Sequence, residues 1–130
     1  MRDLVAALDP ERVQVDDVAR RLYSRDASVL RGGRAGVICF PVTTAEVSAC
    51  VVAAVAHGRD FVARGARTGL AGGAVPCDQP VMLVLTRMDP ILAVGESRRL
   101  AWAEPGGGHL DRSRHRGGPG LHLPPDAPPQ

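Results

Sequence analysis

Apolar positions along the chain follow two spacings, and each spacing predicts a different kind of element. Helical spacing predicts short helices over residues 2–8 and 16–23, so residues 1–17 are expected to form a helical lead-in. The second of these helices has an expected apolar stripe of Val15, Val18, Ala19 and Leu22. Continuous apolar runs predict buried strands at residues 36–41, 60–64 and 80–88.

The stretch 43–58 combines a helical apolar stripe with start and stop signals. Thr43, followed three residues later by Glu46, forms a capping box, and Gly58 suits the C-terminal stop. The apolar stripe is expected to contain Val47, Cys50, Val51, Ala54 and Val55. A strand before this helix and a strand after it predict a βαβ unit with parallel strands.

The pattern becomes weaker toward the C-terminus. The runs "ILAV" and "RLAWAEPG" predict a hairpin, in which Trp102 is expected to be a packing residue. Residues 107–130 are rich in glycine and proline and are expected to form an irregular tail. The predicted fold class is α+β: a βαβ unit continued by a small mixed sheet.

The stretch "ARGARTGLAGGAV", residues 63–75, places four glycines between two apolar runs. Glycines allow a close approach of the backbone to a ligand, and successive exposed N–H groups form an anion-binding nest. Thr68 adds a hydroxyl, and Arg64 and Arg67 add positive charge, which suits a pyrophosphate. The stretch matches neither a Walker loop nor GxGxxG. From the residues alone, a phosphate cradle and a long flexible turn both stay open.

Composition and charge exclude several classes of protein. The net charge of +2 is too small to indicate a nucleic-acid partner. No apolar stretch approaches the roughly 20 residues of a membrane helix. Cys39, Cys50 and Cys77 lack paired spacing, which predicts reduced thiols and a cytoplasmic location.

Other candidate residues have simpler interpretations beside the chemical ones. A zinc site at His109, His115 and His122 competes with solvated loop histidines, because no Cys or acidic residue stands at ligand spacing. The segment "RSRHR" (112–116) also has two interpretations, a phosphate contact and a solvated loop. Cys50 is expected in the core, whereas Cys77 is a loop residue for which a covalent link to a cofactor is the alternative. No metal site is therefore predicted.

Several motifs in order resemble one family. "RGARTGLAGGA" resembles the flavin-pyrophosphate loop "RGxGTxLxGG" of FAD-linked oxidases related to glycolate oxidase and D-lactate dehydrogenase, within the vanillyl-alcohol-oxidase-type (PCMH) superfamily. Further matching stretches follow in family order: "RRLYSRDASVLRG", "VICFPVTTAEVSACVVAAVAHG", "TRMDPILAV", "RLAWAEPG" and "GLHLPPDAPPQ". The resemblance covers residues 18–130.

The resemblance implies that residues 18–106 form the first subdomain of a PCMH-type FAD-binding domain. It implies an FAD-binding oxidoreductase module, in a family whose complete members transfer hydride from a 2-hydroxy acid to the flavin. The cofactor-binding residues it implies are Arg64, Gly65, Ala66, Arg67, Thr68, Gly69, Gly72, Gly73 and Gly106. It assigns no catalytic residue to this chain.

Two departures from the family limit this expectation. Arg67 replaces a glycine; if the position needs a positive φ, the cost is about 1–2 kcal/mol, although the guanidinium could pair with phosphate instead. The sequence also ends before the second half of the flavin domain and the substrate domain of the family. We therefore expect no dehydrogenase turnover from this chain alone. The alternative function is a non-catalytic remnant, or a fragment that needs a partner chain to complete the flavin domain.

Overall fold

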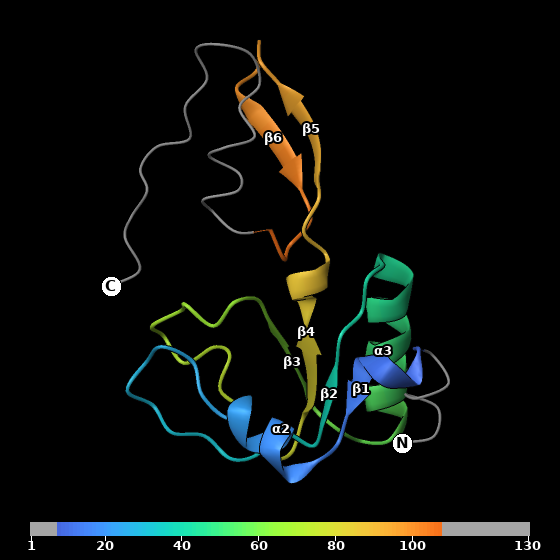
Figure 1. Cartoon of the computed structure of the whole chain (residues 1–130), viewed down its shortest axis with the longest axis vertical. Coiled ribbons are helices and arrows are strands. Elements are labelled where there is room, and N and C mark those ends of the chain that lie inside the picture. Colours follow the sequence, from blue (N-terminus) through green and yellow to red (C-terminus); the bar gives the residue numbers. More distant parts are fainter. Residues whose placement is uncertain (1–7, 108–130) are drawn as a thin grey trace.

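The computed structural model describes residues 8–107, which form a four-stranded mixed sheet and a separate two-stranded hairpin (Figure 1). The elements in chain order are η1 (Pro10–Arg12), β1 (Val13–Gln14), α2 (Asp17–Leu22), β2 (Val37–Cys39), α3 (Thr44–Ala56), β3 (Phe61–Arg64), β4 (Val81–Val84), η2 (Leu85–Arg87), β5 (Ile91–Gly95) and β6 (Leu100–Ala103). The helix predicted over residues 2–8 lies almost wholly outside the described residues. The α+β fold class predicted from the sequence is confirmed.

The sheet has the strand order β1-β2-β4-β3. The three strands β2, β4 and β3 are parallel, and β1 pairs with β2 in the antiparallel sense. The strands β2 and β3 that flank α3 are therefore parallel members of one sheet, as predicted, but β4 lies between them. Every residue of β4 is buried, because this strand has a neighbour on each edge and is covered on both faces.

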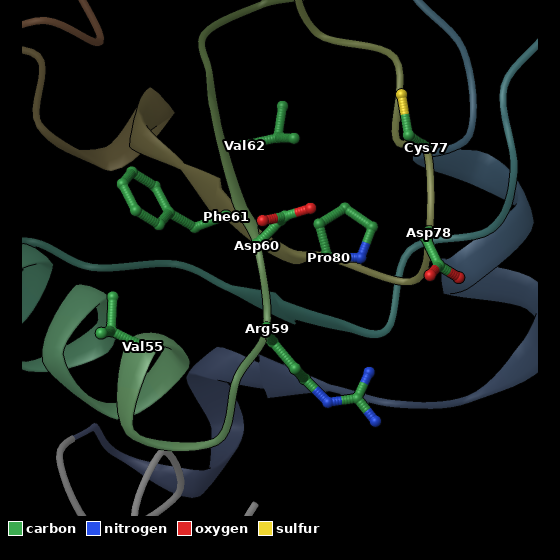
Figure 2. A pocket seen from close by; sticks show the side chains of 8 residues that line it. All are labelled: Val55, Arg59, Asp60, Phe61, Val62, Cys77, Asp78 and Pro80. Carbon is green, nitrogen blue, oxygen red and sulfur yellow. The ribbon is translucent and has the colours of Figure 1, made fainter.

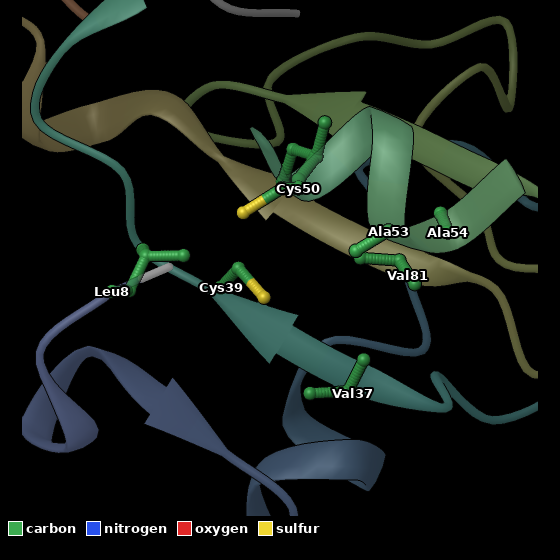
Figure 3. Close-up of a cluster of buried hydrophobic side chains, with 8 residues drawn as sticks. Leu8, Val37, Cys39, Cys50, Ala53, Ala54 and Val81 are labelled. Atoms are coloured by element: carbon green, nitrogen blue, oxygen red, sulfur yellow. The ribbon is translucent and has the colours of Figure 1, made fainter. Parts of the chain in front are cut away.

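Two apolar clusters cover the two faces of the sheet. On one face, Val37, Cys39 and Val81 pack against Cys50 and Ala54 of α3 (Figure 3). On the other face, the alternate strand residues pack beside α2 in a cluster formed by Ala19, Ala35, Ile38, Phe40, Met82 and Val84. The period of two along β2 and β4 thus divides each apolar run between two cores.

The start of α3 is held by an ion pair as well as by its cap. Thr43 Oγ1 accepts the backbone N–H of Glu46 at 3.2 Å, which confirms the predicted cap. The Glu46 carboxylate accepts the N–H of Val42 at 2.7 Å and two guanidinium bonds from Arg12, at 2.7 and 2.9 Å. The bidentate pair ties the N-terminal turn η1 to α3.

Two of the three cysteines lie in the core. Cys39 and Cys50 are buried, Cys77 is exposed, and all three thiols are free. A hydrogen bond with Cys50, together with burial, raises the pKa of Cys39. The Cys39 thiol is therefore protonated and takes part in packing, and the core position predicted for Cys50 is confirmed.

Several sequence expectations are wrong in detail. The lead-in over residues 1–17 is not helical throughout, because Val13–Gln14 form β1 and pair with β2. In the stripe predicted for α2 only Ala19 is buried, and Val18 is 77% exposed. Val55 of α3 and Trp102 of β6 are 64% and 68% exposed, so neither is a core residue. No described element covers these positions.

The described residues include no helix with the length and apolar character needed to cross a membrane. The strand predicted over residues 80–88 ends at Val84, where the chain turns into η2. The predicted hairpin is confirmed as β5 and β6, which pair in antiparallel register.

Replacing Glu46 by glutamine tests the ion pair at the start of α3. The hydrogen bond from Arg12, followed by that from Val42, holds the pKa of Glu46 below its ordinary value of 4.5. The stabilisation is therefore present above that pH and is lost as the pH falls through the lowered folded-state pKa. We expect Glu46→Gln to lower the free energy of unfolding at pH 7 and to flatten its decline between about pH 5 and pH 3. Urea unfolding across this range measures both effects; equal declines in the two proteins would contradict the prediction.

Candidate functional site

The glycine-rich stretch belongs to the connection between β3 and β4, residues 65–80 (Figure 1). These strands are parallel neighbours, with Phe61 opposite Val81 and Arg64 opposite Val84. The connection must therefore leave the carboxyl end of β3 and return to the amino end of β4. Its first residues lie at the carboxyl edge of the parallel strands, where open sheets of this kind bind ligands.

The main chain of the first half of the loop is open to an approaching ligand. A Cβ added at Gly65, Gly69 or Gly73 would meet no atom within 4 Å. Within the described chain, the amide N–H groups of Ala66–Gly69 donate no hydrogen bond to the protein. Most of this segment is exposed, including Thr68. The segment therefore fits an anion that is bound through main-chain donors.

Arg64 points away from this open backbone and is 3% exposed. Its Nη1 donates to the carbonyl oxygen of Tyr23 at 3.0 Å, and its Nη2 donates to that of Arg25 at 3.2 Å. The guanidinium also lies over the Tyr23 ring, 5.2 Å from its centroid. Burial lowers the pKa of Arg64, and the charge of Arg67 acts in the same direction.

Arg67 occupies the left-handed region of backbone space, with φ of 60°. The family pattern has glycine at this position. The sequence analysis predicted strain here if φ is positive, and the observed φ meets that condition, at a cost of about 1–2 kcal/mol. Its Nη1 donates to the carbonyl oxygen of Leu22 at 3.1 Å. The side chain thus contacts the last residue of α2.

The second half of the loop packs against glycines that the sequence analysis did not single out. The N–H of Gly33 donates to Pro76 at 2.8 Å, and that of Gly36 donates to Pro80 at 2.9 Å. A Cβ on Gly33 would clash with the carbonyl of Cys77, and one on Gly36 with that of Gln79. The signal that could have revealed this contact is the spacing "GGRAG" just before β2.

Gly72 and Gly106 have local reasons to be glycine. Gly72 has φ of 78°, and a Cβ there would press on the Leu30 side chain. A Cβ on Gly106 would overlap the carbonyl of Leu85 in η2, and the Gly106 N–H donates to Met88 at 2.7 Å. Because η2 follows the carboxyl end of β4, Gly106 lies at the same edge of the sheet as Gly65.

A row of stacked side chains crosses this edge. The Tyr23 and Phe40 rings meet edge to face, with centroids 5.8 Å apart, between Arg64 on one side and Arg87 on the other. Arg87 lies over Phe40 at 5.5 Å from the centroid. The row places two guanidinium groups near the carboxyl ends of β3 and β4, and the sequence spacing of its members gives no sign of it.

An open hollow of about 370 Å³ lies at the opposite end of β3 (Figure 2). It is lined by Val55, Arg59, Asp60, Phe61, Val62, Cys77, Asp78 and Pro80. Cys77, for which a covalent flavin link was the alternative interpretation, lies in this hollow. It is therefore at the opposite end of β3 from the segment Gly65–Gly69. The described residues hold no metal-binding group of three or more His, Cys, Asp or Glu. His109, His115, His122 and the segment 112–116 lie outside the described residues.

A parallel sheet with an open, glycine-rich loop at its carboxyl edge is an arrangement typical of ligand-binding α/β domains. The model of the FAD binding domain family matches residues 35–124, so the chain belongs to that family. It is 30% identical over 123 residues to the glycolate oxidase subunit GlcD of Bacillus subtilis (strain 168), covering 95% of this chain and 26% of the relative. It is 32% identical over 118 residues to the D-lactate dehydrogenase of Anaerostipes hadrus, covering 90% and 25%.

Among solved structures, an alkyldihydroxyacetonephosphate synthase superposes with a TM-score of 0.76 at 19% identity, over 87% of this chain and 23% of that one. A p-cresol methylhydroxylase superposes with a TM-score of 0.72 at 19% identity, over 82% of this chain and 21% of that one, so the likeness shows a PCMH-type fold. The chain spans about a quarter of the length of the curated relatives it matches.

Two substitutions at Arg67 separate backbone strain from the side-chain bond. Arg67→Ala and Arg67→Gly both remove the bond to Leu22, but only glycine relieves the positive φ. We expect the glycine variant to exceed the alanine variant in free energy of unfolding by about 1 kcal/mol. Urea unfolding of both variants at one pH measures the difference; equal stabilities would mean that the left-handed conformation carries no strain.

Proposed function

We propose that this chain binds FAD through its glycine loop and forms part of the flavin domain of an oxidoreductase that acts on 2-hydroxy acids. The FAD diphosphate would lie on the backbone of Gly65, Ala66, Arg67, Thr68 and Gly69, with Gly72 and Gly73 shaping the loop and Arg64 supporting it. Gly106 would stand near the flavin. The observation that carries the proposal is the run of exposed main-chain amides at the carboxyl edge of a parallel sheet, Ala66–Gly69, which donate no hydrogen bond within residues 8–107.

The chain's own residues would bind and orient the cofactor. The loop amides and the Thr68 hydroxyl would donate hydrogen bonds to phosphate oxygens, and the Arg87 cation would make the edge electropositive. Bound FAD would supply the redox chemistry itself. The substrate class follows from the names of the relatives, a glycolate oxidase subunit and a D-lactate dehydrogenase. No catalytic residue is assigned to this chain.

Leucine at Gly69 would place a side chain where the phosphate is proposed to lie. Because a Cβ at Gly69 meets nothing within 4 Å, the folded chain should accept the substitution. We expect Gly69→Leu to weaken FAD binding by more than about tenfold and to change Tm by less than about 3 °C. Titration of flavin fluorescence measures the affinity.

The matched control is Gly95→Leu in β5, where a Cβ also has room. This variant should bind FAD as the unaltered chain does. Equal FAD affinity in all three proteins, or no binding by the unaltered chain at a large excess of FAD, would overturn the proposal for this chain alone.

A second candidate function is a fragment that needs a partner chain to complete the flavin domain, or a non-catalytic remnant. The hairpin β5–β6 favours a partner, because Leu92, Leu100 and Trp102 are more than half exposed. A two-stranded hairpin is only marginally stable in water unless something packs against it. The cytoplasmic location remains a prediction from the free thiols.

Trp102 is the chain's single tryptophan and reports on this hairpin. In the isolated chain its 68% exposure predicts emission close to that of tryptophan in water and strong quenching by acrylamide. A chain that supplies the rest of the flavin domain should shift the emission to shorter wavelength and reduce the quenching. Unchanged quenching in a stable complex of the two chains would show that the partner does not cover the hairpin.

A further inference from the structure

We infer that Arg64 is a positioning residue that holds the glycine loop to the turn after α2, rather than a ligand of the phosphate. The contacts of Arg64 are observed in the structure, whereas their consequence for FAD binding rests on the proposed function. The side chain leaves the carboxyl end of β3, immediately before Gly65, and turns inward to the carbonyls of Tyr23 and Arg25.

The turn after α2 needs such partners. The last carbonyl groups of a helix accept no hydrogen bond from within the helix, and the negative end of the helix dipole favours cations beside them. Here Arg67 supplies a donor to Leu22, and Arg64 supplies donors to Tyr23 and Arg25. Arg64, the last residue of β3, and Arg67 of the loop therefore donate to three carbonyls of one turn.

The chain that follows this turn contacts the returning half of the loop. Leu30 lies against Gly72, where an added Cβ would press on its side chain, and the Gly33 N–H donates to the carbonyl of Pro76. Residues 22–33 thus hold the loop on both sides of its exposed glycines. Loss of the Arg64 hydrogen bonds would release the first of these sides, the segment that begins at Gly65.

A guanidinium suits this position better than an ammonium would. Its planar fork reaches two carbonyls at once while its face lies on the Tyr23 ring. Its Nε is buried and has no hydrogen-bond partner within the described residues. A lysine would keep the charge but would lose the second carbonyl and the stacking.

The test uses the full 130-residue chain without FAD. Backbone ¹⁵N relaxation gives order parameters for Gly65–Gly69 in the unaltered chain, in Arg64→Met and in Arg64→Lys. We expect values near 0.85 in the unaltered chain and below about 0.6 in Arg64→Met, with β2 and β4 unchanged and Arg64→Lys between the two. The control Arg98→Met removes a charge from an exposed position in the hairpin turn and should change nothing in the loop.

Unchanged loop order parameters in both Arg64 variants would overturn the inference. If Arg64→Met does not fold, Arg64→Lys decides alone, because it keeps the charge and most of the stem. A loop that loosens in a chain that never binds FAD would leave the positioning role standing and refute the proposed function.

FAD titration at two salt concentrations separates positioning from direct contact. A positioning residue should lower the affinity at least tenfold in Arg64→Met without changing its salt dependence. A weaker salt dependence together with unchanged loop order would show that the guanidinium touches phosphate, and would overturn the inference.

Discussion

The pairing of β3 with β4 as parallel neighbours is the constraint on which the site depends. A parallel pair requires a crossover that travels the whole length of the strand, and most proteins build it as a helix. Here residues 65–80 make the return without a helix. Because no helical hydrogen bonds consume their amides, the donors of Ala66–Gly69 are left at the carboxyl edge of the sheet. The length of the loop and its open main-chain amides therefore have one cause.

A crossover without a helix must be stabilised by contacts with other parts of the chain, and residues 22–36 supply these contacts. The first part of this segment receives Arg64 and Arg67, and its second part packs backbone to backbone on residues 76–80 through Gly33 and Gly36. Both halves of the loop are thus positioned by residues that precede β2. The shape of the proposed FAD site consequently depends on a stretch that carries no phosphate-binding motif of its own.

Much of the fold follows from local signals in the sequence. The cap Thr43–Glu46 and the apolar runs that became β2, β3 and β4 are determined by neighbours along the chain, so they were predictable. The insertion of β4 between β2 and β3 and the inward turn of Arg64 depend on contacts about 40 residues apart, which no spacing shows. Val18 and Trp102 were expected in a core because they are apolar, but burial requires a second surface, and none of the described elements supplies one.

Arg67 shows how these constraints meet at one residue. Its backbone adopts the left-handed conformation for which glycine, the residue of the family pattern, is best suited. The side chain contacts Leu22 and adds a second link to the turn that already holds Arg64. It also brings a second cation near a buried one, and its charge contributes to lowering the Arg64 pKa. An anion at the proposed site, on the open side of the loop, would offset that repulsion.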